Sequence, residues 1–511
     1  MKRKILFITT DQQRYDTLSC NGSQVSMTPT LDSFAKEGIR YERAIPQSVV
    51  CMPSRSTILT GQHPSTHGVW MNGVPLPTDA PSVAEVLHQN GYRTALIGKA
   101  HFEPYIDPFN RFYENALSQL PEDSHRQLHR GFEHLEFATH GAMGNLHYAK
   151  WLKENHPEAI GGFYNTLNMS LEVNSEGGGN FGGPQVKINP IDKEWYHTYW
   201  VADRTVEWLK TLKDDENWFC WMSFPDPHHP WDPPQSEIDR IDIKNVPLPA
   251  GYIGNATERE RVLDSKPRHW SYWYTGKLVT NYEAPPHWIP SSLTTDQLKE
   301  ITALNAVEVE LIDDAVKKVW KYLEQRGISD DIDVIFTTDH GELGGDFGLL
   351  FKGPYHVDSL MRLPLIWKPA KSMNITPAVI RQPVGLIDLA PTFCSIANIE
   401  SPNWMQGQKL PINESDRLAG PQLTQWDSEL FGVAVHLRTI TKNNMVLTIY
   451  LPGTLHDGTE GELYDLSSDP LQHVNLFDDP GYLSVKNELI DELVKISPPV
   501  KTPRLELEAP V

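Results

Sequence analysis

The chain of 511 residues is longer than one hydrophobic core usually organises, since cores stop growing at about 250–300 residues, so we expect a large domain and a smaller one. Aromatic residues make up 10% of the sequence, with 15 tryptophans, which excludes an intrinsically disordered protein. The formal net charge of −21 argues against nucleic acid and anionic membranes as partners, so an anionic substrate needs a local basic pocket.

The N-terminal segment and the cysteines bear on the compartment. Only residues 5–8 are apolar before Asp11, which is too short for a signal-peptide core or a membrane span, and no later run reaches spanning length. The cysteines are sparse and lack zinc-binding spacing, so neither a disulfide scaffold nor a cysteine-rich metal site is expected. We therefore predict a cytoplasmic protein with four reduced cysteines: Cys20, Cys51, Cys220 and Cys394.

The first predicted strand covers residues 5–10 and leads directly into Asp11 and Gln12. A later apolar run, residues 334–338, leads in the same way into Asp339 and His340. Polar side chains at the carboxyl ends of parallel strands lie where ligands bind in open α/β sheets. Hard oxygen ligands with a single imidazole suit Ca²⁺, Mn²⁺ or Mg²⁺ better than zinc. We therefore expect one divalent cation held by these four residues, unless the carboxylates are merely solvated.

A cysteine stands just before a short predicted helix. Pro53 is favoured at the first helical position, the following residues complete about two turns, and Gly61 lies just past the end. Cys51 would face the positive pole of this helix, and Arg55 lies one turn on, on the same face. A nucleophile beside an anion pocket is the simplest interpretation. The alternative is a buried structural cysteine at an ordinary helix start.

Further strand ends supply basic groups. Residues 93–98 predict a strand that delivers Lys99 and His101, and residues 218–224 predict one that precedes a proline-rich loop with His228. Taken alone, such side chains have plainer explanations, because a lysine can lie extended on the surface and a loop histidine can bond to backbone.

The alternation of strands and helices predicts an α/β fold. Residues 1–400 are expected to form a large, mostly parallel central sheet sandwiched by helices, with long loops over residues 102–190 and one long helix over residues 295–325. Strand-like alternation after residue 433 predicts a smaller α+β subdomain, residues 401–511, with an antiparallel sheet and one packed helix. Its proline-rich tail is expected to reach a neighbouring subunit, which would make the protein a homo-oligomer.

The order Cys-x-Pro-Ser-Arg, closed by Thr-Gly, resembles the signature of the formylglycine-dependent (type I) sulfatases of the alkaline phosphatase superfamily. The resemblance runs nearly end to end: it includes Asp11, Gly98-Lys99-Ala100-His101, Pro227–Pro230, Thr338–Gly341 and Lys352. It selects His228 over His229. It implies an alkaline-phosphatase-like fold, a cation (Ca²⁺ first) that residue 51 also binds, and oxidation of Cys51 to formylglycine by a transient partner, the formylglycine-generating enzyme.

Two features place the chain within this family. Many sulfatases carry Asp-Asp and Asp-Asn where this sequence has Asp11-Gln12 and Asp339-His340, and the variant resembles choline-sulfatase-like enzymes and phosphonate monoester hydrolases. Asn72 resembles a substrate-contacting asparagine of the phosphonate hydrolases. Lys99 and His101, in contrast, resemble the residues that sulfatases carry at these positions, where phosphonate hydrolases usually differ.

The resemblance and the chemistry together imply a sulfuric ester hydrolase that acts on a small anionic sulfate ester. The hydrated aldehyde at position 51 would attack, and a cation would polarise the ester. The charge on the substrate oxygens would be neutralised by Arg55, Lys99 and Lys352. His228 would protonate the leaving alcohol, and His101 would deprotonate the second hydroxyl.

Two alternatives stay open. One is a phosphonate monoester or phosphodiester hydrolase with the same site, and the other is a catalytically silent binding protein that kept the fold. The leaving group is also open, since sugar, aryl and alkyl sulfates all fit the predicted site.

Overall fold

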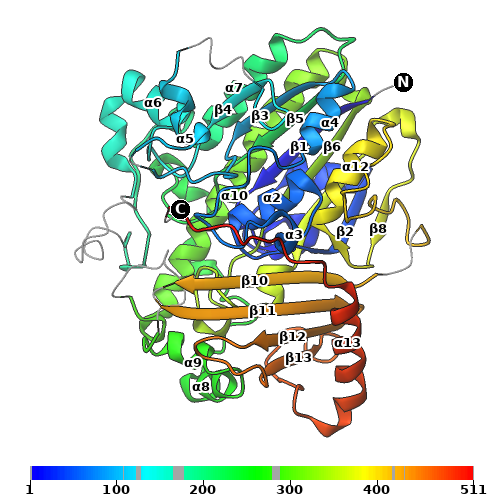
Figure 1. Cartoon of the computed structure of the whole chain (residues 1–511). Helices are drawn as coiled ribbons and strands as arrows, with labels where there is room; N and C mark the ends of the chain where they lie inside the picture. The colour runs from blue at the N-terminus through cyan, green and yellow to red at the C-terminus, as the bar shows by residue number, and fades with distance from the viewer. Residues whose placement is uncertain are drawn as a thin grey trace.

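The computed structural model describes residues 3–107, 109–121, 128–164, 178–278, 288–416, 420–430 and 432–509. Within these residues the centre of the molecule is a nine-stranded sheet (Figure 1). Its strands are β1 (Lys4–Thr10), β2 (Ile39–Ile45), β3 (Arg93–Gly98), β4 (His134–Phe137), β5 (Trp218–Ser223), β6 (Ile332–Thr338), β7 (Leu363–Lys368), β8 (Ala378–Ile380) and β9 (Val384–Gly385). The order is β4-β3-β5-β1-β6-β7-β2-β8, and β9 pairs with β2. Only the two pairs that β7 makes, with β6 and β2, are antiparallel, which confirms the mostly parallel sheet.

Helices cover both faces of this sheet. Alternate side chains of a strand point to opposite faces, so a strand that is apolar throughout needs cover on both. On β1, Ile5 and Phe7 belong to one hydrophobic core, and Leu6 and Ile8 belong to another. The first core includes helices α2 (Cys51–Thr60), α4 (Val83–Gln89) and α12 (Leu389–Ile396), and the second includes α1 (Pro29–Glu37), α7 (His197–Lys210) and α10 (Thr295–Gln325). The predicted sandwich of helices around the sheet is confirmed.

Some short elements lie where the sequence pattern predicts long loops. Strand β4 and helix α6 (His147–Asn155) fall within residues 102–190. The prediction was too broad here, because elements of this length contain too few apolar residues to establish a period. The remaining helices of the large domain are α3 (Pro64–His67), α5 (Tyr113–Ala116), α8 (Ala256–Asp264), α9 (His269–Tyr274) and α11 (Asp358–Met361).

The parallel pairing brings the carboxyl ends of β1, β3, β5 and β6 to one edge of the sheet. Strands β1 and β6 pair in register up to Thr10 and Thr338, so the next residues, Asp11 and Asp339, leave the sheet side by side. Strand β5 flanks β1 on its other side, and β3 follows β5. Side chains that are far apart in the sequence therefore gather at this edge.

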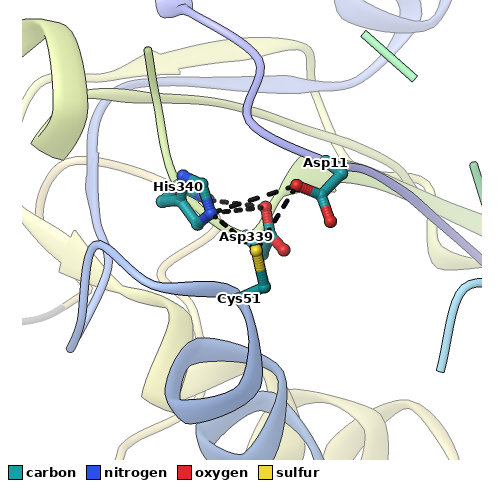
Figure 2. A group of neighbouring side chains, drawn as sticks. All are labelled: Asp11, Cys51, Asp339 and His340. Carbon is teal, nitrogen blue, oxygen red and sulfur yellow. Dashed lines mark hydrogen bonds and ion pairs between the residues drawn. The ribbon is translucent and has the colours of Figure 1, made fainter. Parts of the chain in front are cut away.

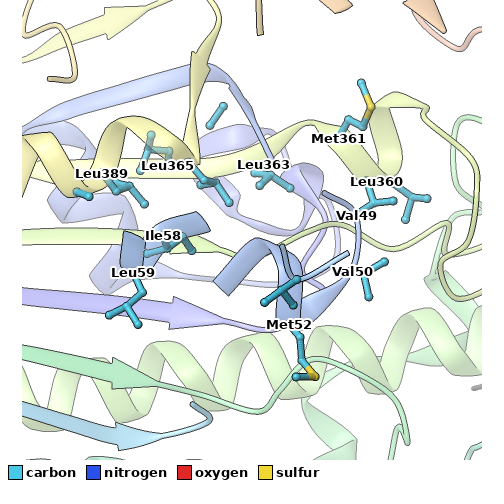
Figure 3. Close-up of a cluster of buried hydrophobic side chains, with 14 of the residues drawn as sticks. Val49, Val50, Met52, Ile58, Leu59, Leu360, Met361, Leu363, Leu365 and Leu389 are labelled. Carbon is cyan, nitrogen blue, oxygen red and sulfur yellow. The ribbon is translucent and has the colours of Figure 1, made fainter. Parts of the chain in front are cut away.

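Helix α2 begins at Cys51, two residues earlier than Pro53, the predicted start. Proline is tolerated this close to the start because the first-turn N–H groups have no intrahelical acceptor. Gly61 ends the helix in the left-handed conformation, at φ 66°, as predicted. Apolar side chains before and along the helix pack in one core with side chains of neighbouring elements (Figure 3). The first group is Val49, Val50, Met52, Ile58 and Leu59, and the second is Leu360, Met361, Leu363, Leu365 and Leu389.

The C-terminal part forms the predicted antiparallel sheet. Its strands are β10 (Gln422–Leu430), β11 (Val433–Lys442), β12 (Met445–Leu451) and β13 (Gly461–Asp465), and one face packs against α13 (Leu483–Ile496). The other face joins the core of the large domain through Trp426, Leu437, Tyr450 and Tyr464. Strand β10 was not predicted, because most of its residues are polar. The boundary at residue 400 stays a prediction.

The C-terminal tail runs back from α13 along residues 65–73 of its own chain (Figure 1). Trp70 Nε1 donates to the carbonyl of Leu505 at 2.8 Å, and the N–H of Glu508 donates to the carbonyl of Gly73 at 2.9 Å. The expected contact with a neighbouring subunit stays a prediction, and the contacts found are within one chain. Among the described residues, no helix has the length and apolar character that a membrane crossing requires.

Candidate active site

Four buried side chains from three elements meet at the carboxyl edge of the sheet (Figure 2). Asp11 follows β1, Cys51 is the first residue of α2, and Asp339 and His340 follow β6. One ligand atom of each lies within 4.8 Å of the others. Cys51 Sγ is 3.2 Å from His340 Nε2 and 3.7 Å from Asp11 Oδ1. The two strand ends and the helix start that the sequence singled out therefore form one site.

Arg55 lies beneath the two carboxylates. Its Nε donates to Asp339 Oδ2 at 2.8 Å, and its Nη2 lies 3.2 Å from Asp11 Oδ2. Its Nη1 donates to the carbonyl of Lys99 and to Ser223 Oγ. The side chain is 0% exposed. Arg55 thus balances and orients the carboxylates, whereas the sequence suggested that it would face the substrate.

The donor set fits a hard divalent cation. His340 Nδ1 donates to the carbonyl of Gly341 at 2.9 Å, so Nε2 carries the lone pair and faces the carboxylates. Burial lowers the pKa of His340, which keeps the ring neutral. Burial tends to raise the pKa of Asp11, but the charges of Lys99 and Arg55 outweigh it and hold that pKa well below its usual value. Two carboxylates and one imidazole are ligands that Ca²⁺, Mn²⁺ and Mg²⁺ accept.

Gln12 lies beside this cluster and contacts the last predicted lysine. Its backbone has a positive φ of 58°, and its N–H donates to Asp339 Oδ1 at 3.1 Å. Its side-chain oxygen accepts from Lys352 Nζ at 2.5 Å, and its amide nitrogen donates to Glu342. The side-chain oxygen of Gln12, which the sequence predicts as a metal ligand, is therefore hydrogen-bonded to Lys352 and lies at the border of the cation site.

Two lysines approach the cluster from different sides. Lys99 Nζ lies 2.7 Å from Asp11 Oδ2. Burial tends to lower the pKa of Lys99, but Asp11 outweighs it and the net pKa is raised, so the amine is charged. Lys352 Nζ lies 2.9 Å from His228 Nε2, and His228 Nδ1 contacts the carbonyl of His229. Because Lys352 has only donors, His228 Nε2 accepts and its ring is neutral in this arrangement.

His101 and Asn72 complete the predicted set. His101 is buried after β3, with its ring edge-on to Tyr105 at a centroid distance of 4.7 Å. Asn72 Oδ1 accepts from the backbone N–H of Met52 at 2.9 Å. Asn72 therefore caps α2, whose residue Val50 offers no capping side chain. All of the predicted site residues lie at this edge of the sheet or directly behind it.

The sequence interpretation missed His140. It follows β4, and its Nε2 lies 3.1 Å from Lys99 Nζ, while its ring stacks on His228 at 4.2 Å between centroids. Its strand-end position is the same signal that identified Lys99 and Asp339. The signal could not be read because β4, with four residues, lies inside a stretch that predicts only loops.

Comparisons with known proteins identify the class of protein. The fold is that of the sulfatases of the alkaline phosphatase superfamily. A family model described as Sulfatase matches residues 3–399, so the chain belongs to the sulfatase family. A second model, described as N-sulphoglucosamine sulphohydrolase, C-terminal, matches residues 345–498.

Individual relatives cover nearly the whole chain. The uncharacterised sulfatase YidJ of Escherichia coli (strain K12) is 26% identical over 98% of this chain and 89% of its own length. The arylsulfatase of Clostridium perfringens is 26% identical over 97% and 94%. The phosphonate monoester hydrolase of Agrobacterium radiobacter has the same fold, with a TM-score of 0.78, 22% identity, and coverage of 97% of this chain and 95% of that one.

Proposed function

We propose that this sulfatase cleaves sulfate monoesters with a formylglycine made from Cys51 and releases inorganic sulfate. One observation carries the proposal: Cys51 lies at the start of α2, 3.2 Å from His340 and beside two carboxylates and Lys99. Burial, aided by Asp11, raises the pKa of the Cys51 thiol, so the unmodified side chain stays protonated and is a weak nucleophile. The formylglycine-generating enzyme would be the transient partner that performs the oxidation.

A divalent cation, Ca²⁺ first, would be held by Asp11, Asp339, His340 and side chain 51, with Gln12 at the border. When bound, it supplies positive charge that lowers the pKa of a hydroxyl and polarises the ester. Arg55 pairs with both carboxylates and holds them in place. The positive charges of the bound cation and of Arg55 would allow a chain that is acidic as a whole to attract an anionic ester at this site.

In the first step, one hydroxyl of the hydrated aldehyde loses its proton to solvent, its oxygen bonds to sulfur, and the bond from sulfur to the leaving oxygen breaks. Lys99 and Lys352 stabilise the charge on the sulfate oxygens. The leaving oxygen takes a proton from the Lys352–His228 pair, whose nitrogens are 2.9 Å apart and share one proton between them.

In the second step, His101 removes the proton of the remaining hydroxyl. The carbon–oxygen bond to sulfate then breaks, the aldehyde forms again, and water restores the diol. An unmodified cysteine or serine offers no second hydroxyl, so it would need a separate water for release.

The experiment is a comparison of kcat/KM on an aryl sulfate and on an aryl phosphonate monoester, using protein with a measured aldehyde content. We expect the sulfate to be preferred. Equal rates on both esters, or no turnover of the sulfate by protein rich in aldehyde, would overturn the proposal.

Phosphonate monoester hydrolysis is the second candidate. It is supported by the pairs Asp11-Gln12 and Asp339-His340 and by the amide nitrogen of Asn72, which is buried and has no hydrogen-bond partner among the described residues. A preference for the phosphonate in the same experiment would favour it. Self-association through the tail also stays a proposal, and light scattering of the full chain and of a chain ending at residue 497 tests it.

A further inference from the structure

One buried imidazole outside the proposed mechanism contacts two of its residues. His140 is 4% exposed and lies between Lys99, from the end of β3, and His228, from the loop after β5. Its Nε2 is 3.1 Å from Lys99 Nζ. Its ring is stacked on that of His228, with centroids 4.2 Å and planes 21° apart. A single side chain therefore joins two groups that arrive from different strands.

The protonation of His140 follows from its partner. An ammonium group has three donors and no acceptor, so Nε2 of His140 must accept, and the proton of the neutral ring is on Nδ1. Burial, together with the charge of Lys99, lowers the pKa of His140 well below its usual value. The imidazole is thus a neutral acceptor in a basic environment.

This contact fixes the direction of the Lys99 ammonium. One of its N–H groups donates to Asp11 Oδ2 at 2.7 Å and a second to His140 Nε2. With two donors fixed by partners on different strands, rotation about the terminal bond is blocked. The third donor then points in one direction, as a preorganised contact to an anionic oxygen requires.

We propose that His140 is a positioning residue, which directs Lys99 toward the sulfate group of the substrate and holds the ring of His228 by stacking. The proposal rests on the proposed function for its substrate, a sulfate monoester. It assigns His140 no chemical step of its own.

Two substitutions separate the two contacts. His140→Phe keeps a ring against His228 and removes the acceptor, whereas His140→Gln keeps an acceptor and removes the ring. We expect His140→Phe to lower kcat/KM for 4-nitrophenyl sulfate by about 10- to 100-fold, the usual effect of losing a hydrogen bond to a charged group, and His140→Gln to recover part of that loss. His134→Gln, on β4 and partly exposed, is the matched control and is expected to keep the wild-type rate.

A double-mutant cycle tests whether His140 acts through Lys99. In a Lys99→Ala background, His140→Phe should change kcat/KM by less than about threefold, because the contact is already lost. An equal loss in both backgrounds would show a general packing role and overturn the proposal.

Binding of inorganic sulfate supplies a readout without turnover. Sulfate should raise the melting temperature of the wild type and of His134→Gln, and it should raise that of His140→Phe much less. Equal sulfate stabilisation of His140→Phe and wild type would also overturn the proposal. If the wild type hydrolyses no sulfate ester, the proposed function fails, while the sulfate titration still decides the role of His140.

Discussion

Arg55 Nε donates to Asp339 Oδ2 at 2.8 Å. Arg55 lies one helical turn after Cys51, the residue that we propose as the nucleophile. The same guanidinium reaches Asp11, so a single cation on α2 neutralises the carboxylates that end two neighbouring strands. The position of Cys51 and the position of its cation site are thus set by one helix. This coupling explains why an arginine four residues after the cysteine belongs to the motif.

Arg55→Ala should therefore destabilise the protein as well as inactivate it. Without the guanidinium, two buried carboxylates lack their partner, and we expect the free energy of unfolding to fall by about 3–5 kcal/mol in chelator. Added Ca²⁺ should recover part of the loss by taking over the charge. Urea unfolding with and without Ca²⁺ measures both effects, and Arg43→Ala, which breaks a pair with Asp358 outside the site, is the control. Unchanged stability of Arg55→Ala would contradict this role.

Removal of the cation should abolish turnover reversibly. Dialysis against a chelator is expected to lower the rate on an aryl sulfate by at least about 100-fold, since the cation stabilises transition-state charge. Ca²⁺, Mn²⁺ and Mg²⁺ are then added back separately, and atomic emission gives the bound metal. His340→Ala should bind less metal at every concentration. Full activity in a sample shown to be metal-free would exclude the predicted cation role.

His228→Asn should discriminate between leaving groups. A proton donor matters little for a nitrophenolate and much for an alkoxide, because the basicity of the departing oxygen differs. We expect the substitution to slow an alkyl sulfate about tenfold more than 4-nitrophenyl sulfate. Steady-state rates on both esters measure this ratio. The same factor for both would show that His228 orients the substrate or Lys352 and donates no proton.

Buried histidines should make the fold sensitive to acid. Burial lowers the pKa of His67 and that of His356 to about 3, against an unfolded value of 6.5. His67 Nδ1 accepts from the N–H of Val69, so protonation would break that bond. The stability from these neutral rings is complete above pH 6.5 and falls as the pH drops toward 3.

The expected acid effect is about 2–3 kcal/mol per ring between pH 7.5 and pH 4.5. Urea unfolding at the two pH values gives the wild-type loss, and His356→Gln should reduce that loss by about one ring's contribution. His134→Gln should leave the loss as it is. An identical loss in all three proteins would show that His356 does not contribute.

Asn72→Ala separates capping from substrate binding. Loss of the bond to the N–H of Met52 should cost about 1 kcal/mol of stability, as for other helix caps. If the amide nitrogen also contacts the substrate, KM should rise beyond what this small change explains. An unchanged KM would leave Asn72 as a cap of α2 only.

Long and strongly patterned elements could be predicted from the sequence. The pattern predicts helix α10 at residues 295–325, which are its observed bounds, because its apolar residues recur at helical spacing; the structure adds a capping box at Thr294. Asp11 and Asp339 could be placed together because each ends a buried strand, and parallel strands share an edge.

Side-chain contacts across the sheet edge could not be predicted. The sequence does not show that Arg55 lies under the carboxylates, that Gln12 is held by Lys352, or that His140 reaches Lys99. Each contact depends on the depth and rotation of a helix or loop, which packing decides after the strands are in place. The start of α2 was wrong by two residues for a similar reason, since Asn72 supplies its cap from a distant segment.

The most direct test of the central claim is the state of residue 51 in active protein. Trypsin releases the peptide of residues 44–55. In the aldehyde form this peptide is lighter than the thiol form, because the side chain has lost H₂S and gained one oxygen atom. Across preparations with different aldehyde fractions, the rate on an aryl sulfate per mole of protein should be proportional to that fraction and vanish in Cys51→Ala. Full turnover by protein in which this peptide carries an intact thiol would contradict the account.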